Sequence, residues 1–136
     1  LFAYFAEPSA WELFPEVLDT LAALKERRRT LAVISNFDSR LVRILDGLRI
    51  GSWFDDVFVS SRVGYAKPDR QIFATALQRH GLRPEDCLHV GDSEDNDLHG
   101  AQNDGLTGLL IDRRQETPHG KPYRIQSLQE IIARLD

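Results

Sequence analysis

The sequence predicts a three-layer α/β protein, in which helices cover both faces of a parallel sheet. Short runs of apolar residues alternate along the chain with longer segments whose apolar residues recur at the helical period. This alternation is typical of repeated strand–helix–strand units, and wholly apolar short runs are typical of strands buried on both faces. The 136 residues are 42% hydrophobic and 28% charged, which suits one domain with its own core.

Four elements are predicted in the first half of the chain. A helix begins at Pro15, a residue suited to the first helical turn, and its apolar residues from Val17 to Leu24 fall on one face. This helix ends near Arg28, in a basic run that complements the helix dipole. The elements that follow are a strand over residues 31–34, an amphipathic helix over 41–48 and a strand over 57–59.

The second half of the chain continues the alternation. A helix entered at Pro68 ends at Gly81, a typical C-terminal glycine, and a strand over residues 87–90 follows. The next helix stops at Gly105. After it come a strand over 106–111, a polar loop over 112–121 and a weak strand over 123–125. The segment from Ser127 to Glu130 has the pattern of a capping box and opens the last helix.

Polar side chains stand at or just past the ends of three predicted strands. Ser35 and Asn36 end the first strand, and Lys67 lies just past the second. Asp92 ends the third strand, and Asp97 follows within the next helix. Because the carboxyl ends of parallel strands share one edge of a sheet, we expect these side chains to meet in one crevice. A hydroxyl, an amide, an ammonium and carboxylates together suit a phosphoryl group and its Mg2+.

Each of these residues also has a plain structural explanation. Ser35 suits a turn, Lys67 a solvated loop, and Asp97 the first turn of a helix. The Gly91-Asp92 pair alone is equally typical of a capped surface helix. Three independent coincidences at strand ends make a shared site the better explanation. His89 has no Cys or His partner at metal-binding spacing, so we interpret it as a core histidine.

Charge and composition exclude several classes of partner. The net charge is −4, and no basic stripe is available to displace counterions from nucleic acid. No apolar run approaches the roughly 18 residues that a membrane span needs. Cys87 is the single cysteine, so an internal disulfide is excluded and a reducing compartment such as the cytoplasm is expected.

Three motifs resemble those of the haloacid dehalogenase-like (HAD-like) hydrolases, specifically a helical-cap, phosphatase-like subgroup with a Rossmann-like core. They are the segments 33–36, 66–69 and 91–97. The resemblance implies that Ser35, with Asn36, binds the phosphoryl group. It implies that Lys67 is a catalytic residue that also binds phosphate and steadies the reacting charges. It further implies that Asp92 and Asp97 hold Mg2+, directly or through water.

The family's first motif, an Asp-x-Asp pair after an apolar strand, does not occur before Ser35. The resemblance therefore implies that residues 14–136 form a HAD-like core lacking its central first strand and its nucleophile. Residues 1–13 are expected to be the remnant of the helical cap and its linker. We expect the chain to be the C-terminal part of a larger enzyme and to be inactive alone. Its unpaired strand edges are expected to favour self-association.

The resemblance implies a Mg2+-dependent phosphatase that, when complete, hydrolyses small phosphate monoesters through an aspartyl-phosphate. A 2-haloacid dehalogenase is the first alternative, because it shares the Ser-Asn and Lys motifs. Such an enzyme needs no metal and is expected to lack an acid at the position of Asp92, whose presence favours the phosphatase. A non-catalytic protein that binds phosphate or metal is the second alternative, favoured by the missing nucleophile.

Overall fold

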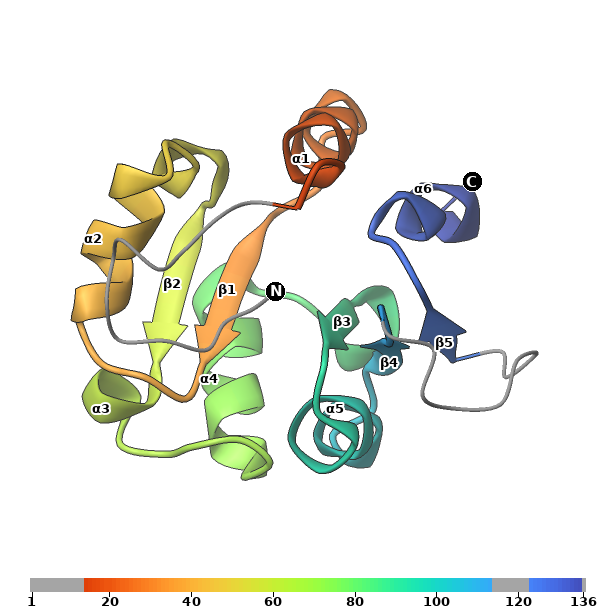
Figure 1. The fold of residues 1–136 in the computed structure, drawn as a ribbon. Coiled ribbons are helices and arrows are strands. Elements are labelled where there is room, and N and C mark those ends of the chain that lie inside the picture. The colour runs from red at the N-terminus through yellow and green to blue at the C-terminus, as the bar shows by residue number, and fades with distance from the viewer. Residues whose placement is uncertain (1–13, 114–122, 136) are drawn as a thin grey trace.

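The computed structural model describes residues 14–113 and 123–135 and has the predicted α/β class (Figure 1). In one sheet, β1 (Ala32–Ser35) pairs in parallel with β2 (Asp56–Val59). The other sheet has the parallel order β3 (Leu88–Gly91), β4 (Thr107–Ile111) and β5 (Arg124–Ile125). The strands begin and end within one residue of their predicted bounds. The predicted cap remnant, residues 1–13, lies outside the described residues.

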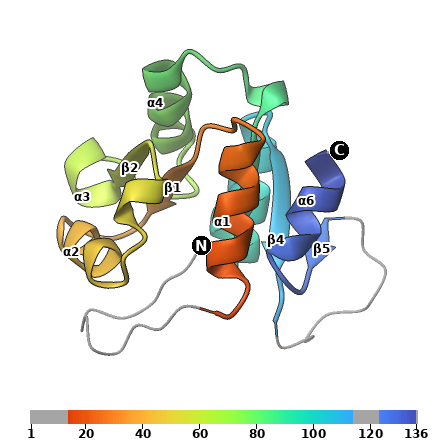
Figure 2. The same cartoon turned by 90° about the horizontal axis from the view of Figure 1, so that it is seen from above.

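Helices lie on both sides of the strands. The α-helices are α1 (Val17–Glu26), α2 (Arg40–Gly47), α3 (Ser60–Val63), α4 (Arg70–His80), α5 (Gly100–Asn103) and α6 (Gln129–Leu135). The other helical elements are η2 (Gly51–Trp53), η3 (Pro84–Asp86) and η4 (Glu94–His99). Helices α1 and α6 lie side by side above the strands in Figure 1, whereas α4 and α5 lie below them (Figures 1 and 2). The three predicted layers are therefore present.

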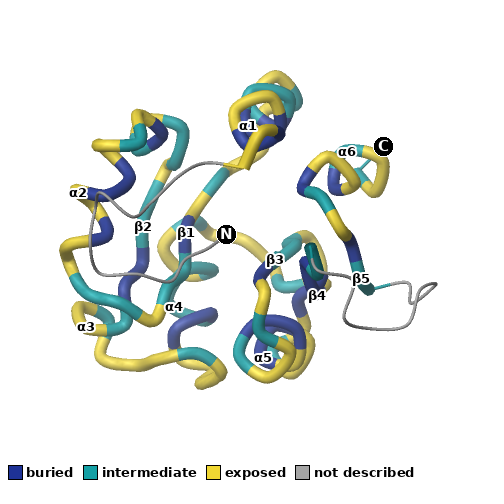
Figure 3. The backbone as a smooth tube through the Cα atoms, viewed as in Figure 1, coloured by how far each residue is buried: buried dark blue, intermediate teal, exposed yellow. Residues whose placement is uncertain are grey.

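Two apolar clusters occupy the spaces between these layers. The larger includes residues from α1, α6 and both sheets, among them Leu21, Val33 and Leu109. The smaller is built around Ile72 and Phe73 of α4, which pack with residues of α5 and the turn before β4. The tube in Figure 3 shows that buried and exposed residues alternate along the helices. No helix of the described residues is long and apolar enough to cross a membrane.

Two local features differ from the prediction. Ser60 and Ser61 directly follow the strand predicted over residues 57–59 and begin the four-residue helix α3, which the sequence did not predict and which Gly64 ends with a φ of +91°. The predicted helix after Asp92 begins as the π-helix η4 and becomes α-helical at Gly100. A π-turn spaces the backbone hydrogen bonds one residue wider, as between Leu98 N–H and Ser93 O. The periodicity of the sequence does not reveal this wider hydrogen-bond spacing.

Two of the predicted helix boundaries carry the capping contacts that the sequence indicated. Gly81 follows α4 in the left-handed conformation, with a φ of +62°. At α6, the Ser127 hydroxyl accepts from Gln129 N–H, and the Glu130 carboxylate accepts from Ser127 N–H at 3.0 Å. These reciprocal bonds satisfy main-chain donors that a helix start leaves without partners.

Glu16 joins the two ends of the described fold. It precedes α1 and is buried, and its carboxylate accepts from Leu128 N–H at 3.2 Å and from Arg113 Nη2 at 2.7 Å. Burial raises the pKa of Glu16, but the hydrogen bonds from Arg113 and the main chain outweigh burial, so the pKa is lowered. Glu16 therefore stabilises the fold fully above its unfolded pKa near 4.5, and this contribution is lost as the pH falls toward the folded pKa.

We expect Glu16→Gln to lower the free energy of unfolding by about 1–3 kcal/mol at pH 7, because hydrogen bonds to a charged group are lost. The variant should also lose less stability than the unchanged protein as the pH falls below about 4.5. Urea unfolding at several pH values measures both effects. Glu85→Gln is the control, because Glu85 forms a solvent-exposed ion pair with Arg83 at 3.5 Å and is not buried. Identical acid dependence in Glu16→Gln and the unchanged protein would contradict this assignment.

Candidate functional site

The structure brings the five predicted site residues to one open cavity of about 160 Å3. Ser35 and Asn36 reach it from the end of β1, and Lys67 reaches it from the loop between α3 and α4. Asp92 and Asp97 reach it from the end of β3 and from η4. Gly91, Ser93 and Asn96 also line the cavity, although the sequence did not predict them as site residues. The predicted meeting of separate strand ends is therefore present in the structure.

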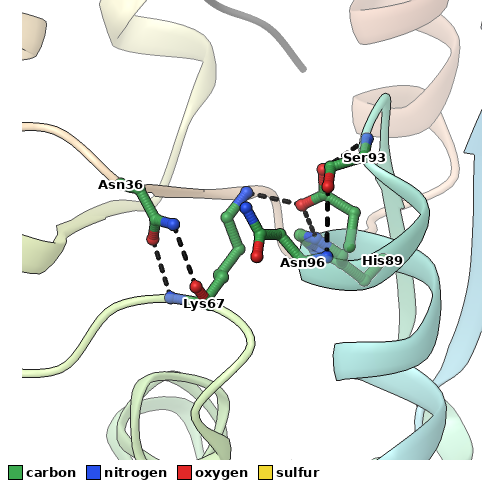
Figure 4. A network of polar contacts seen from close by, with 6 residues as sticks. Asn36, Lys67, His89, Ser93 and Asn96 are labelled. Atoms are coloured by element: carbon green, nitrogen blue, oxygen red, sulfur yellow. Dashed lines mark hydrogen bonds and ion pairs between the residues drawn. The ribbon is translucent and has the colours of Figure 1, made fainter.

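Two hydrogen bonds connect Asn36 to the loop that carries Lys67 (Figure 4). Its amide nitrogen donates to the Lys67 carbonyl at 3.0 Å, and its amide oxygen accepts from the Lys67 N–H at 2.7 Å. This pair of hydrogen bonds connects the end of β1 to a loop 31 residues further along the chain. Asn36 was predicted to bind phosphate, and that role stays a prediction. The observed contacts give it a second task, which is to hold the Lys67 main chain.

Lys67 and Asp97 form a buried ion pair beside the cavity. Lys67 Nζ lies 2.5 Å from Asp97 Oδ1, and the two side chains are only 12% and 4% exposed. Burying a single charge is costly, so the two charges depend on each other in this position. The pair holds the ammonium at the cavity that Ser35 and Asp92 also line.

The Asp97 carboxylate accepts hydrogen bonds from three parts of the chain. Oδ1 contacts Lys67 Nζ and, at 2.9 Å, His89 Nε2. Oδ2 accepts from the Ser93 N–H at 3.1 Å. Burial raises the pKa of Asp97, but the hydrogen bond from His89 and the charge of Lys67 outweigh burial and hold the pKa well below its usual range. Asp97 is therefore ionised at neutral pH.

Gly91 makes room for this carboxylate. A Cβ on Gly91 would collide with the Asp97 carboxylate, which folds back against the end of β3. Glycine therefore permits a close approach here, although the approaching group is a side chain of the same protein. Ser93 caps η4 at this point, since its hydroxyl accepts from the Asn96 N–H at 3.1 Å. These contacts place Asn96 and Asp97 at the cavity.

The interpretation of His89 as a core histidine is incomplete. Its ring does pack against the buried Phe73, but it also contacts Asp97. Burial lowers the pKa of His89 and outweighs the opposing effect of Asp97, so the ring is neutral at pH 7. Alternate residues of a strand face the same side, and His89 shares a face with Gly91, which lies against Asp97. This alternation was the signal in the sequence that pointed toward the site.

Asp92 is the exposed carboxylate of the cavity, whereas Asp97 is buried. Within residues 14–113 and 123–135, no group of three or more His, Cys, Asp or Glu side chains is placed to hold a metal ion. Mg2+ is commonly bound by one or two carboxylates together with water and phosphate oxygens, and Asp92 with Asp97 suits that kind of site. Their assignment as metal ligands stays a prediction.

Comparisons with known proteins agree with the architecture. A family model for haloacid dehalogenase-like hydrolases matches residues 1–105. "Haloacid dehalogenase-like hydrolase domain-containing protein 3" of Mus musculus is 37% identical, over 100% of this chain and 57% of its own. A phosphoserine phosphatase of Thermus thermophilus is 35% identical, over 96% of this chain and 54% of its own. The chain thus spans little more than half the length of these relatives.

A solved structure of a HAD phosphatase is similar to this chain in fold. The crystal structure of a HAD phosphatase from Thermococcus onnurineus superposes with a TM-score of 0.88 at 26% sequence identity. The match covers 94% of this chain and 60% of that protein.

Proposed function

The chain belongs to the haloacid dehalogenase-like hydrolase family, and we propose that it carries the phosphate-binding part of a Mg2+-dependent phosphatase. The proposed substrates are small phosphate monoesters. The observation that supports this most directly is the buried Lys67–Asp97 pair, which holds an ammonium at a cavity lined by Ser35 and Asp92. The similarity to a phosphoserine phosphatase and to a glyceraldehyde 3-phosphate phosphatase supports phosphate chemistry.

Each residue of the cavity has a task in this proposal. Lys67 donates hydrogen bonds to the phosphoryl oxygens, and Asp97 keeps its ammonium in place. The Ser35 hydroxyl donates to another phosphoryl oxygen. A phosphate monoester brings about two negative charges, and each unit pair of like charges at ~4 Å costs about 4 kcal/mol at an effective dielectric constant of ~20. When bound by Asp92 and, directly or through water, by Asp97, Mg2+ supplies the positive charge that offsets this repulsion.

The attacking carboxylate is proposed to come from outside these 136 residues. The carboxylates among the described cavity-lining residues are Asp92 and Asp97, and both are assigned to charge and metal binding. Among the described strands, β1 pairs only with β2, and β3 only with β4. We propose that the free edges of β1 and β3 receive a further strand that ends in the nucleophile. In the isolated chain, these edges favour self-association.

The single cysteine supports a reducing compartment such as the cytoplasm.

Assays of the full-length protein with p-nitrophenyl phosphate and with 2-chloropropionate test the proposal. We expect phosphate release only with Mg2+, loss of activity with EDTA, and recovery when Mg2+ is added back. Chloride release that continues in EDTA would contradict the phosphatase and support the dehalogenase. Phosphate binding without turnover of either substrate would contradict both enzymes.

A further inference from the structure

His89 has contacts for which the proposed function gives no reason. It lies within β3 and is not among the residues that line the cavity. Its ring packs edge-on against Phe73, with centroids 5.1 Å apart and ring planes at 86°. Its side chain is 12% exposed, and Nε2 lies 2.9 Å from Asp97 Oδ1. His89 therefore reaches from the interior to the carboxylate that contacts Lys67 (Figure 4).

The direction of this hydrogen bond follows from its partners. An ionised carboxylate only accepts hydrogen bonds, so His89 Nε2 must carry the hydrogen and donate it. Asp97 Oδ1 then has two donors, His89 from β3 and Lys67 from the loop after α3. Because Phe73 is fully buried, the His89 donor is anchored in the core. The Lys67 ammonium, by contrast, is at the end of a flexible four-carbon side chain.

Lys67 is thus held at two places. Asn36 fixes its main chain, and Asp97 Oδ1 fixes its ammonium. We propose that His89 is a positioning residue for Lys67: it orients Asp97, and Asp97 in turn holds the Lys67 ammonium at the cavity. The positioning itself does not depend on the proposed function, whereas its effect on turnover rests on that function.

A measurement on the unchanged full-length protein tests the hydrogen bond directly. The 15N NMR signals of the His89 ring distinguish the Nε2–H tautomer from the Nδ1–H tautomer. We expect the Nε2–H form, because only that form donates to Asp97. The Nδ1–H form would overturn the proposal. This test needs no variant, so it does not depend on whether a substitution folds.

Variants then test the effect on Lys67. His89→Leu keeps an apolar group against Phe73 but removes the donor, and His89→Gln restores an N–H donor. His80→Leu is the matched control, because His80 also packs edge-on against a phenylalanine, at 6.2 Å, and lies 3.3 Å from an aspartate, but does not line the cavity. The first readout is the Lys67 ammonium signal in a low-temperature 1H–15N spectrum. The second is hydrolysis of p-nitrophenyl phosphate.

We expect the Lys67 signal to be lost to rapid exchange in His89→Leu and to persist in His89→Gln and His80→Leu. In His89→Leu, kcat should fall by about 10- to 100-fold, with a smaller change in KM, and His89→Gln should recover most of it. A persistent Lys67 signal in folded His89→Leu would overturn the proposal, as would loss of the signal in folded His89→Gln. If the signals change as expected but no protein hydrolyses phosphate esters, the positioning role is supported and the proposed function fails.

Discussion

Replacing Lys67 by methionine is expected to lower the free energy of unfolding by about 3–5 kcal/mol, because it leaves the buried Asp97 charge without its cation. In the full-length protein, we also expect phosphate ester hydrolysis to fall by at least about 100-fold, the typical cost of removing one donor to the reacting charge. Methionine keeps most of the side-chain volume, so the change tests the charge rather than the packing. Urea unfolding and steady-state kinetics measure the two effects.

Lys25→Met is the matched control for Lys67→Met. Lys25 also pairs with an aspartate, Asp55, at 2.8 Å, but the two side chains are 32% and 40% exposed. Exposed ion pairs contribute about 0–1 kcal/mol, so this variant should stay close to the unchanged protein in stability and activity. Equal losses in both variants would show that burial of the Lys67–Asp97 pair has no special effect. Full activity in Lys67→Met would refute the proposed role of Lys67.

Asp92→Asn is expected to abolish Mg2+-dependent phosphatase activity while the protein stays folded. Asp92 is exposed at the carboxyl end of β3, so a substitution of the same shape should leave the protein folded. An amide lacks the negative charge with which a carboxylate attracts a divalent ion. Removing a residue that only hydrogen-bonds to a metal ligand lowers metal affinity by about 10- to 100-fold. Removing a direct ligand should therefore weaken Mg2+ binding by at least about 100-fold. Isothermal titration with Mg2+ measures this change.

Asp95→Asn provides the comparison for Asp92→Asn. Asp95 lies in η4, its side chain is 90% exposed, and it is not among the residues that line the cavity. Asp95→Asn removes one negative charge three residues from Asp92, so the change in net charge is the same in both variants. We expect its Mg2+ affinity and turnover to stay within about twofold of the unchanged protein, because exposed charges are strongly screened by salt. Unchanged turnover in Asp92→Asn would refute the metal assignment.

Local patterns in the sequence were enough to place most of the elements and most of the site. Apolar runs and helical periodicity predicted the strand bounds to within one residue, and the capping box and Gly81 marked the helix ends. Ser35, Lys67 and Asp92 were found because parallel strands bring their carboxyl ends to one edge, so a position near a strand end already implies a position in space. Applying this rule requires only that the sequence predicts the class of fold, here a parallel α/β fold.

The tertiary structure alone decided which polar groups bind one another. Asn36 holds a main chain 31 residues away, and Lys67 pairs with an aspartate 30 residues away. Asp97 lies in η4, Gly91 leaves room for its carboxylate, and this carboxylate contacts both Lys67 and His89. Such pairings depend on how sheets, loops and helices are placed relative to one another in three dimensions, and no local periodicity encodes that placement. For this reason the sequence identified the residues of the site, while their hydrogen bonds, including the one from His89, became visible only in the fold.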